Sequence, residues 1–268
     1  MRNVNKGIWL AVMAALTIGL SGCKDGGVNV FSIEDDKNFG AQMEAEIASN
    51  PTDYPLLSQA QYPQAYAYLN AMRDTILASG QLKHANDFAW KLYIIKDDAT
   101  LNAFCTPGGY IYVYTGLIKY LDNASSLAGV LGHEMAHADQ RHSTEQLTKQ
   151  YGLSLLVSVV AGTTNAGQLA EIAAGLTALA FSREHETDAD KHSVKYLCPT
   201  QYRAEGAADF FQKMAGEPQP PAFLSTHPNP DNRVANIQAE DNSLGCNNVP
   251  TNQVEVNSYA AFKASLPN

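Results

Sequence analysis

The chain has 268 residues, of which 45% are hydrophobic and 17% are charged, and its formal net charge is −9. A chain of this length and composition can bury one sizeable core. Its acidic balance argues against nucleic acid as a partner, because surfaces that bind nucleic acid are basic.

Residues 1–22 have the pattern of a lipoprotein signal peptide. Two basic residues precede an apolar stretch, Gly7–Leu20, that is short for a membrane-spanning helix. The LSGC sequence that follows resembles a bacterial lipobox, in which cleavage before Cys23 leaves that residue acylated. Lys24, rather than Asp, comes next, and the sorting rule for bacterial lipoproteins then favours the outer membrane. The alternative is an ordinary secretory signal with an incidental cysteine.

This N-terminus predicts an envelope protein whose membrane contact is lipidated Cys23 and whose domain faces the periplasm. We expect a tether over residues 23–30, one domain over residues 31–240 and a C-terminal tail over residues 241–268. Within the tail, a short helix is expected at Ser258–Ser265.

Two helices and then three strands are expected at the start of the domain. Apolar residues at helical spacing predict helices over Phe31–Ala48 and Pro63–Ser79. Runs of strand-forming residues follow over Trp90–Lys96, Leu101–Cys105 and Tyr110–Tyr114. We expect these strands to form a small antiparallel meander.

A free edge of such a sheet can pair with an extended peptide. We assign that edge to Asn102, Ala103 and Phe104. An ordinary capped edge strand explains the same residues equally well.

Residues 127–142, LAGVLGHEMAHADQRH, carry the pattern H-E-x-x-H on an apolar run without proline. On a helix, His133 and His137 lie one above the other and can present two imidazoles to one Zn²⁺. Glu134 leaves the helix about 100° further round and could take a proton from water there. A surface helix with three polar residues is the competing interpretation, which the apolar flanks disfavour.

The segment after the motif helix has no charged residue over positions 150–170, and a cluster of acidic residues follows over positions 181–190. Over residues 151–180 the apolar runs are too short to span a membrane, and we expect a hairpin of two helices that covers the catalytic helices. Three cysteines remain besides Cys23. We favour a disulfide between Cys198 and Cys246, with Cys105 as a buried free thiol.

A catalytic zinc site needs a third protein ligand. The extended pattern with a third histidine is absent, because Gln140 and Ser143 occupy its glycine and histidine positions and His142 lies one position too early. Glu186 and Asp190 lie four residues apart in FSREHETDAD, on one helical face. One of them could bind zinc while the other accepts a hydrogen bond from a ligand histidine.

The chain resembles the HtpX-like zinc metallopeptidases, a family that includes the CAAX prenyl protease. The resemblance is strongest to the periplasmic BepA-like and LoiP-like lipoproteins. Four segments carry it, in the order of the family: NAFCTPGGYIYVYTGL (102–117), GHEMAHADQRH (132–142), FSREHETDAD (181–190) and STHPNPDNR (225–233). Together they span most of the mature chain.

The resemblance implies one zinc ion per chain, held by His133, His137 and Glu186, with Glu134 as the general base. It also implies that Asp190 supports a ligand and that Asn102–Phe104 lie near the substrate channel.

The resemblance further implies that His227 lies on a loop near the metal. There it either stabilises the oxyanion of the reaction, together with Arg233, or occupies the fourth position of zinc and holds the enzyme inactive. Two features depart from the family pattern: Cys105 stands where a small residue such as alanine is expected, and no helical-repeat domain follows residue 240. Docking to the outer-membrane assembly machinery is therefore the less favoured expectation for a partner.

These features predict an α+β fold of the gluzincin type, mostly helical, with a small antiparallel sheet beside the H-E-x-x-H helix. The predicted function is a zinc-dependent metalloendopeptidase of the bacterial cell envelope that cleaves misfolded or unassembled envelope proteins as extended polypeptide. One alternative is a latent protease or non-proteolytic chaperone whose zinc site is closed by His227. A zinc amidase that acts on cell-wall peptides is a further alternative, disfavoured by the strand edge and the family segments.

Overall fold

The computed structural model describes residues 29–215, 222–228, 232–246 and 253–267. The predicted signal peptide, the lipidation site Cys23 and most of the tether lie outside these residues. The described elements, in chain order, are α1 (Ile33–Ser49), α2 (Pro63–Ala78), β1 (Lys91–Ile95), β2 (Ala103–Thr106), β3 (Tyr110–Tyr114), α3 (Thr115–Tyr120), α4 (Ala124–Asp139), α5 (His142–Tyr151), α6 (Leu153–Val160), α7 (Ala166–Leu176), α8 (Arg183–Leu197), α9 (Gly206–Met214), α10 (Ala222–Thr226), α11 (Arg233–Leu244) and α12 (Gln253–Ala264).

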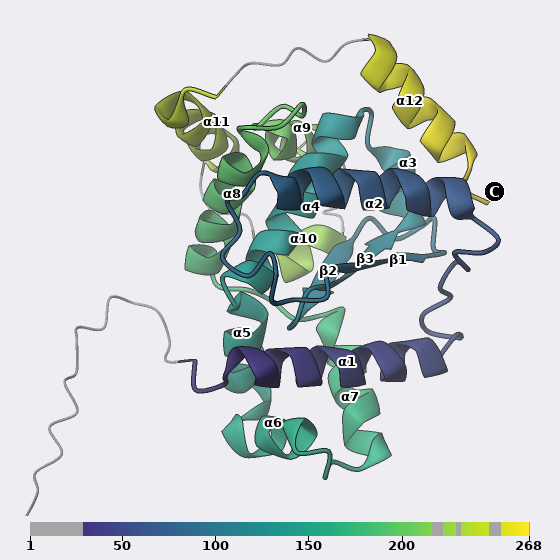
Figure 1. Ribbon diagram of the computed structural model, residues 1–268, viewed down its shortest axis with the longest axis vertical. Coiled ribbons are helices and arrows are strands. Elements are labelled where there is room, and N and C mark those ends of the chain that lie inside the picture. Colours follow the sequence, from purple (N-terminus) through teal and green to yellow (C-terminus); the bar gives the residue numbers. More distant parts are fainter. Residues whose placement is uncertain (1–28, 216–221, 229–231, 247–252, 268) are drawn as a thin grey trace, which may run out of the picture.

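The predicted fold class is confirmed: the described chain is mostly helical with one small sheet beside the motif helix (Figure 1). The sheet, however, is mixed rather than antiparallel. Its order is β1-β3-β2, with β3 parallel to β1 and antiparallel to β2. The expectation of a meander was wrong because residues 96–102 carry the chain past the position next to β1, so β2 does not pair with β1. After the tight turn at Pro107-Gly108-Gly109, β3 takes that position and lies between β1 and β2.

The sheet is buried on both faces. Ile111 and Val113 of β3 belong to the core cluster around α2 and α4, whereas the three tyrosines of β3 belong to a second cluster around α1. Strand alternation accounts for this division, because successive side chains point to opposite faces. The sheet therefore separates two cores, and the motif helix lies on one side of it.

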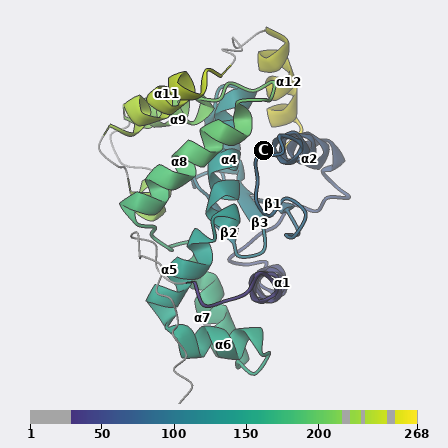
Figure 2. The same cartoon turned by 60° about the vertical axis from the view of Figure 1, so that its left-hand side comes forward.

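Helix α4 is the centre of the larger core, and all of its residues from Ala124 to Asp139 are buried. Its N-terminus is capped by Asn123, whose side chain accepts from the Ser126 N–H. Helix α8 lies along one side of α4, and β2 approaches from another (Figure 2). A wholly buried helix can carry polar residues only where they meet partners, so the motif residues must be paired or bind an ion.

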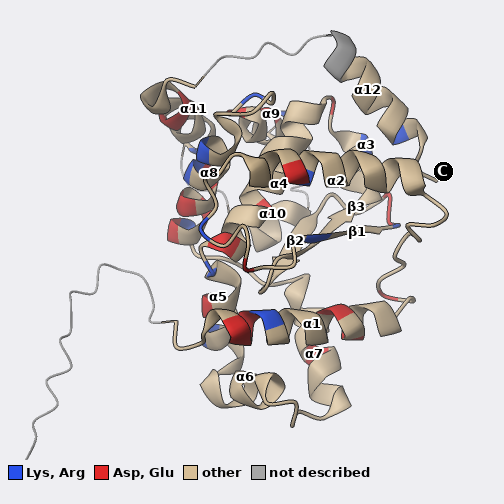
Figure 3. Cartoon of the chain, in the orientation of Figure 1, with Lys and Arg blue, Asp and Glu red and all other residues tan. Residues whose placement is uncertain are grey.

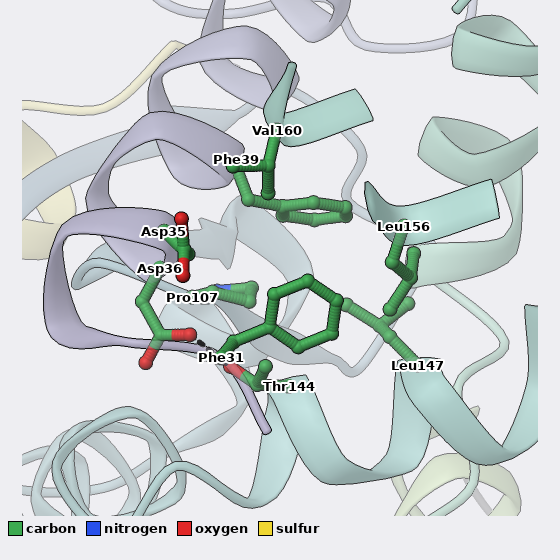
Figure 4. A pocket seen from close by; sticks show the side chains of 9 residues that line it. All are labelled: Phe31, Asp35, Asp36, Phe39, Pro107, Thr144, Leu147, Leu156 and Val160. Atoms are coloured by element: carbon green, nitrogen blue, oxygen red, sulfur yellow. Dashed lines mark hydrogen bonds between the residues drawn. The ribbon is translucent and has the colours of Figure 1, made fainter. Parts of the chain in front are cut away.

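Helix α1 closes the second core at the N-terminal end of the described chain. Ser32 caps it through a capping box with Asp35. The Phe31 ring packs beside Leu147 and Leu156 (Figure 4). Asp36, which is buried, accepts hydrogen bonds from Arg141 and from the Thr144 hydroxyl.

The predicted pair of helices after the motif exists as α6 and α7, but it packs against α1 and α5 rather than over the catalytic helices α4 and α8. Residues 150–170 contain no charged side chain, and α6 is accordingly uncharged in Figure 3. Within the described residues, no helix is both long and apolar enough to cross a membrane.

The C-terminal elements complete the larger core. Cys198 at the end of α8 is joined to Cys246 just after α11 by a disulfide, the pair favoured from the sequence, and Cys105 is a buried free thiol. Helix α12 is longer than the expected helix and buries Tyr259 and Phe262 beside α2.

Candidate metal centre

Two helices bring the predicted ligands together. His133 and His137 project from α4, and Glu186 projects from the first turn of α8, which is capped by Ser182. The two His Nε2 atoms lie 3.0 Å apart. The Glu186 carboxylate lies 3.4 Å from Nε2 of His133 and 3.3 Å from Nε2 of His137. All three side chains are buried, at 1% exposure or less.

A fourth donor comes from the end of α10. His227 Nδ1 lies 3.2 Å from His133 Nε2 and 3.0 Å from Glu186 Oε1. The ligand atoms of all four residues lie within 4.8 Å of one another. A tetrahedral ion bound at about 2.0–2.1 Å, as zinc is by nitrogen and oxygen, separates its ligand atoms by about 3.3–3.4 Å. These separations are close to that spacing, and all four residues that supply the atoms are buried, so the donor set fits a metal ion.

Backbone hydrogen bonds and ring contacts fix α10, and with it His227. The Phe223 N–H donates to the Leu101 carbonyl just before β2, at 3.1 Å. The Phe181 N–H, just before α8, donates to the Thr226 carbonyl at 3.0 Å. The buried Phe223 ring stacks on the His227 imidazole, with centroids 4.1 Å apart. The α10 segment is therefore hydrogen-bonded both to the residue before β2 and to the residue before α8, and this holds His227 beside the other donors.

Glu134 lies beside the cluster and not within it. It is fully buried, and neither carboxylate oxygen has a hydrogen-bond partner among the described residues. Oε1 lies 3.3 Å from His227 Nε2. Burial raises the pKa of the Glu134 carboxyl above its ordinary value, which makes it a stronger base than an exposed glutamate.

Asp190 lies one turn after Glu186 on α8 and supports His133. Its Oδ1 lies 2.8 Å from His133 Nδ1, the nitrogen that faces away from the cluster. Arg233, at the start of α11, holds both Asp190 oxygens at 2.7 Å and lies 3.0 Å from Glu186 Oε2. The guanidinium also covers the Phe211 ring at 3.8 Å. Asp190 therefore contacts the ligand His133, and Arg233 contacts the ligand Glu186.

The structure also places His142 at the site, which the sequence reasoning did not do. Its Nδ1 lies 3.2 Å from Nδ1 of His137. On one continuous helix, His142 would point elsewhere. Helix α4 instead ends at Asp139, and Arg141 adopts a left-handed conformation with φ 65°, which turns His142 back toward the cluster.

The predicted substrate edge lies next to the cluster, on β2. The Tyr114 N–H donates to the Asn102 carbonyl, so Asn102 and Phe104 direct their backbone groups to β3. The backbone groups of Ala103 and Cys105 therefore point to the outer edge. The Asn102 amide oxygen accepts from the Ala103 N–H, and the Cys105 carbonyl lies 3.4 Å from the Ser143 hydroxyl.

The chain shows clear similarity to known proteins. The model of peptidase family M48 matches residues 63–241. The mitochondrial metalloendopeptidase OMA1 of Schizosaccharomyces pombe is 30% identical over 216 residues, which cover 78% of this chain and 62% of that protein. Beta-barrel assembly-enhancing protease is 28% identical in Yersinia pestis, over 74% of this chain and 42% of that protein. In Escherichia coli it is 27% identical, over 71% and 40%. The chain thus matches between 40% and 62% of the length of these relatives.

Proposed function

Since the chain belongs to peptidase family M48 and is a metallopeptidase, we propose that it is a zinc-dependent metalloendopeptidase of the bacterial cell envelope. Its substrates are misfolded or unassembled envelope proteins, which it cleaves at internal peptide bonds. The proposal rests above all on one observation: four buried donor residues, whose ligand atoms lie within 4.8 Å of one another, lie beside Glu134, a buried glutamate whose carboxylate oxygens have no hydrogen-bond partner among the described residues.

We assign His133, His137 and Glu186 as the residues that would hold zinc. Imidazole nitrogen and carboxylate oxygen are the ligands that zinc takes at catalytic sites. When bound, zinc supplies Lewis acidity, which polarises a peptide carbonyl and makes water a better nucleophile.

Glu134 is the general base in this proposal. Its raised pKa suits it to accept a proton from water and to pass that proton to the leaving amine. Glu134 follows His133 directly in the sequence, and its side chain leaves α4 toward His227.

His227 has a role that depends on whether α10 is docked. With α10 docked, His227 Nδ1 lies where a fourth ligand belongs, and we propose that this arrangement is a resting state. When α10 moves, His227 and Arg233 would supply positive charge or N–H donors to the oxyanion of the reaction. The same observation favours the second candidate function, a non-proteolytic chaperone whose metal site is permanently closed.

The substrate would bind as an extended polypeptide along the outer edge of β2, where the backbone groups of Ala103 and Cys105 point outward. The hydrogen bond from Phe223 to Leu101 ties α10 to the entry of that edge. Docking of α10 and binding of a peptide would therefore compete for neighbouring space.

For the location, we propose attachment to the outer membrane through lipidated Cys23, with the domain in the periplasm. The lipobox-like sequence and the names of the bacterial relatives support it. The variant Cys23→Ser should leave the membrane fraction and appear in the soluble periplasmic fraction. If that variant stays in the membrane fraction, the anchor is not at Cys23.

The central experiment replaces Glu134 by glutamine. Glu134→Gln keeps the shape of the side chain but removes the base, so zinc content by elemental analysis should match the wild type. Cleavage of unfolded casein should fall by a factor of 100 or more, of the order expected for loss of general base catalysis. Full activity of this variant, or a wild type without zinc, would disprove the mechanism.

A second experiment separates the latent protease from the chaperone. In His227→Ala the fourth donor is removed while the other three ligands remain. A protease held inactive by His227 should cleave casein faster in this variant. A protease that uses His227 to stabilise the oxyanion should cleave it more slowly. Absence of cleavage in both proteins, with zinc bound in both, would favour the chaperone.

A further inference from the structure

The two histidines of α4 are supported in different ways. A histidine that binds metal through Nε2 usually donates its Nδ1–H to a fixed acceptor, which orients the ring. For His133 that acceptor is the Asp190 carboxylate, at 2.8 Å. For His137 the atom that faces Nδ1 is another imidazole nitrogen, Nδ1 of His142, at 3.2 Å.

The contacts of each ring indicate which of its nitrogens would carry the proton. His137 Nε2 faces His133 and Glu186, so it is the atom that would bind the metal. In a neutral ring bound through Nε2, the proton is on Nδ1. His142 can accept that N–H only if its own Nδ1 is bare, and its proton must then be on Nε2.

A carboxylate lies where that proton would point. His142 Nε2 is 3.3 Å from Oδ2 of Asp188, which lies two residues after Glu186 on α8. An ionised carboxylate accepts hydrogen bonds and donates none, so Asp188 favours the tautomer of His142 with the proton on Nε2. The ring of His142 is held in place by stacking on His185, with centroids 4.4 Å apart and planes 15° apart.

From these contacts, and on the basis of the zinc site proposed above, we infer that His142 is a positioning residue of the metal centre. It accepts the Nδ1–H of His137, and Asp188 fixes the tautomer that makes this possible. The chain from His137 through His142 to Asp188 is thus the counterpart, for the second histidine ligand, of Asp190 for the first. It leads from a fully buried ring to a carboxylate whose side chain is 44% exposed.

Two substitutions at His142 separate the hydrogen bond from the packing. His142→Phe keeps an aromatic ring for stacking on His185 but has no acceptor. His142→Asn loses the ring but keeps an acceptor, because its amide oxygen is attached to Cγ as Nδ1 is. The zinc dissociation constant of the mature protein, measured by competition with a chromophoric chelator, should rise roughly 10- to 100-fold in His142→Phe. In His142→Asn it should stay close to that of the wild type.

Asp188 provides a second, independent arm. In Asp188→Asn the side-chain amide can donate to Nε2 of His142 and thereby favour the wrong tautomer, so zinc binding should weaken as in His142→Phe. The matched control is His192→Ala. His192 also lies 3.2 Å from Asp188 Oδ2, but its contacts are with Asp188 and Tyr196 and not with a ligand residue, so its loss should leave zinc affinity unchanged.

A spectroscopic readout does not depend on any variant. In ¹⁵N-labelled, zinc-loaded protein, the ring-nitrogen shifts of His142 should show a bare Nδ1 and a protonated Nε2. The opposite tautomer would overturn the inference, and so would wild-type zinc affinity in a folded His142→Phe. A wild type that binds no zinc would instead disprove the proposed function itself, which separates the two failures.

Discussion

At the scale of single residues, the pKa values of the two histidines of α4 are shifted in opposite directions. Burial alone would lower the pKa of His133, but the carboxylates of Glu186 and Asp190 raise it to about 9. His137 lacks a carboxylate at Nδ1, and burial holds its pKa well below the ordinary value. In the metal-free protein near neutral pH, His133 is therefore protonated and His137 is neutral.

This difference predicts a proton release on zinc binding. Below pH 9, His133 must lose a proton before it can bind zinc, whereas His137 is already neutral and Glu186, whose pKa is held well below its ordinary value, is already ionised. Zinc affinity should consequently rise with pH, by up to tenfold per pH unit, and level off above about pH 9. Calorimetry in buffers of different ionisation heat should detect release of about one proton at pH 7. No proton release there would contradict the assignment.

Asp190 offers a test of buried charge. Arg233 is 2% exposed and holds both Asp190 oxygens. In Asp190→Ala the arginine loses its main partner, so the free energy of unfolding should fall by about 3–5 kcal/mol. Asp98→Ala is the control, because Asp98 pairs with Lys119 at the surface, and its loss should cost at most about 1 kcal/mol. Similar costs in urea denaturation would show that burial does not govern the Asp190 pair.

Most of the residues that meet at the site could be predicted from the sequence, His227 and Arg233 only through the family resemblance. The H-E-x-x-H spacing and the Glu186–Asp190 spacing depend only on helix geometry, which short-range sequence determines. His142 was missed because its position depends on a left-handed residue, Arg141, that ends the helix. Non-glycine residues rarely adopt that conformation, and no local signal at Arg141 predicts it.

At the scale of elements, α4 and α9 cross in direct backbone contact. A Cβ atom at Gly129 of α4 would lie 2.1 Å from the Ala207 nitrogen of α9, and one at Gly206 would lie 2.0 Å from the Ser125 carbonyl oxygen. The two helices can approach this closely only because both positions lack a side chain.

We therefore expect Gly129→Ala to destabilise the protein by roughly 1–3 kcal/mol, although alanine is the better helix former. The control is Gly167→Ala on α7, where the nearest atom to a Cβ is 3.4 Å away. That substitution should be neutral or stabilise by up to about 1 kcal/mol. The comparison requires only thermal or urea unfolding, and a stable Gly129→Ala would show that the helices can separate at little cost.

The positions of the strands could be predicted from the sequence, but their order in the sheet could not. The β-formers and the Pro107-Gly108-Gly109 turn were enough to locate all three strands. Their order depends on the path of residues 96–102, which lies outside any strand and has no periodic pattern. The same limit explains α6 and α7, whose apolar faces were predicted but whose partner, α1, lies more than a hundred residues earlier in the chain.

At the scale of the whole molecule, the disulfide constrains the C-terminal part of the site. It joins residues 48 positions apart, and His227 and Arg233 lie between them. Closing a loop of that length reduces the entropy of the unfolded chain, which stabilises the folded state by about 4 kcal/mol in the chain-entropy model.

The double variant Cys198→Ala, Cys246→Ala should accordingly lose about 2–4 kcal/mol of unfolding free energy. Wild type in reducing agent should behave in the same way. The control is Cys105→Ala, whose stability should still fall when reductant is added, because its disulfide is intact. If the double variant unfolds at the wild-type urea concentration, the bond contributes nothing to stability.

The position of this bond divides the residues of the site into two groups. His133, His137 and Glu186 all come from helices that precede Cys198 or end at it, whereas His227 and Arg233 belong to the segment that only the bond encloses. Reduction of the bond is therefore expected to loosen His227 and Arg233 more than the three ligands, which α4 and α8 hold in place.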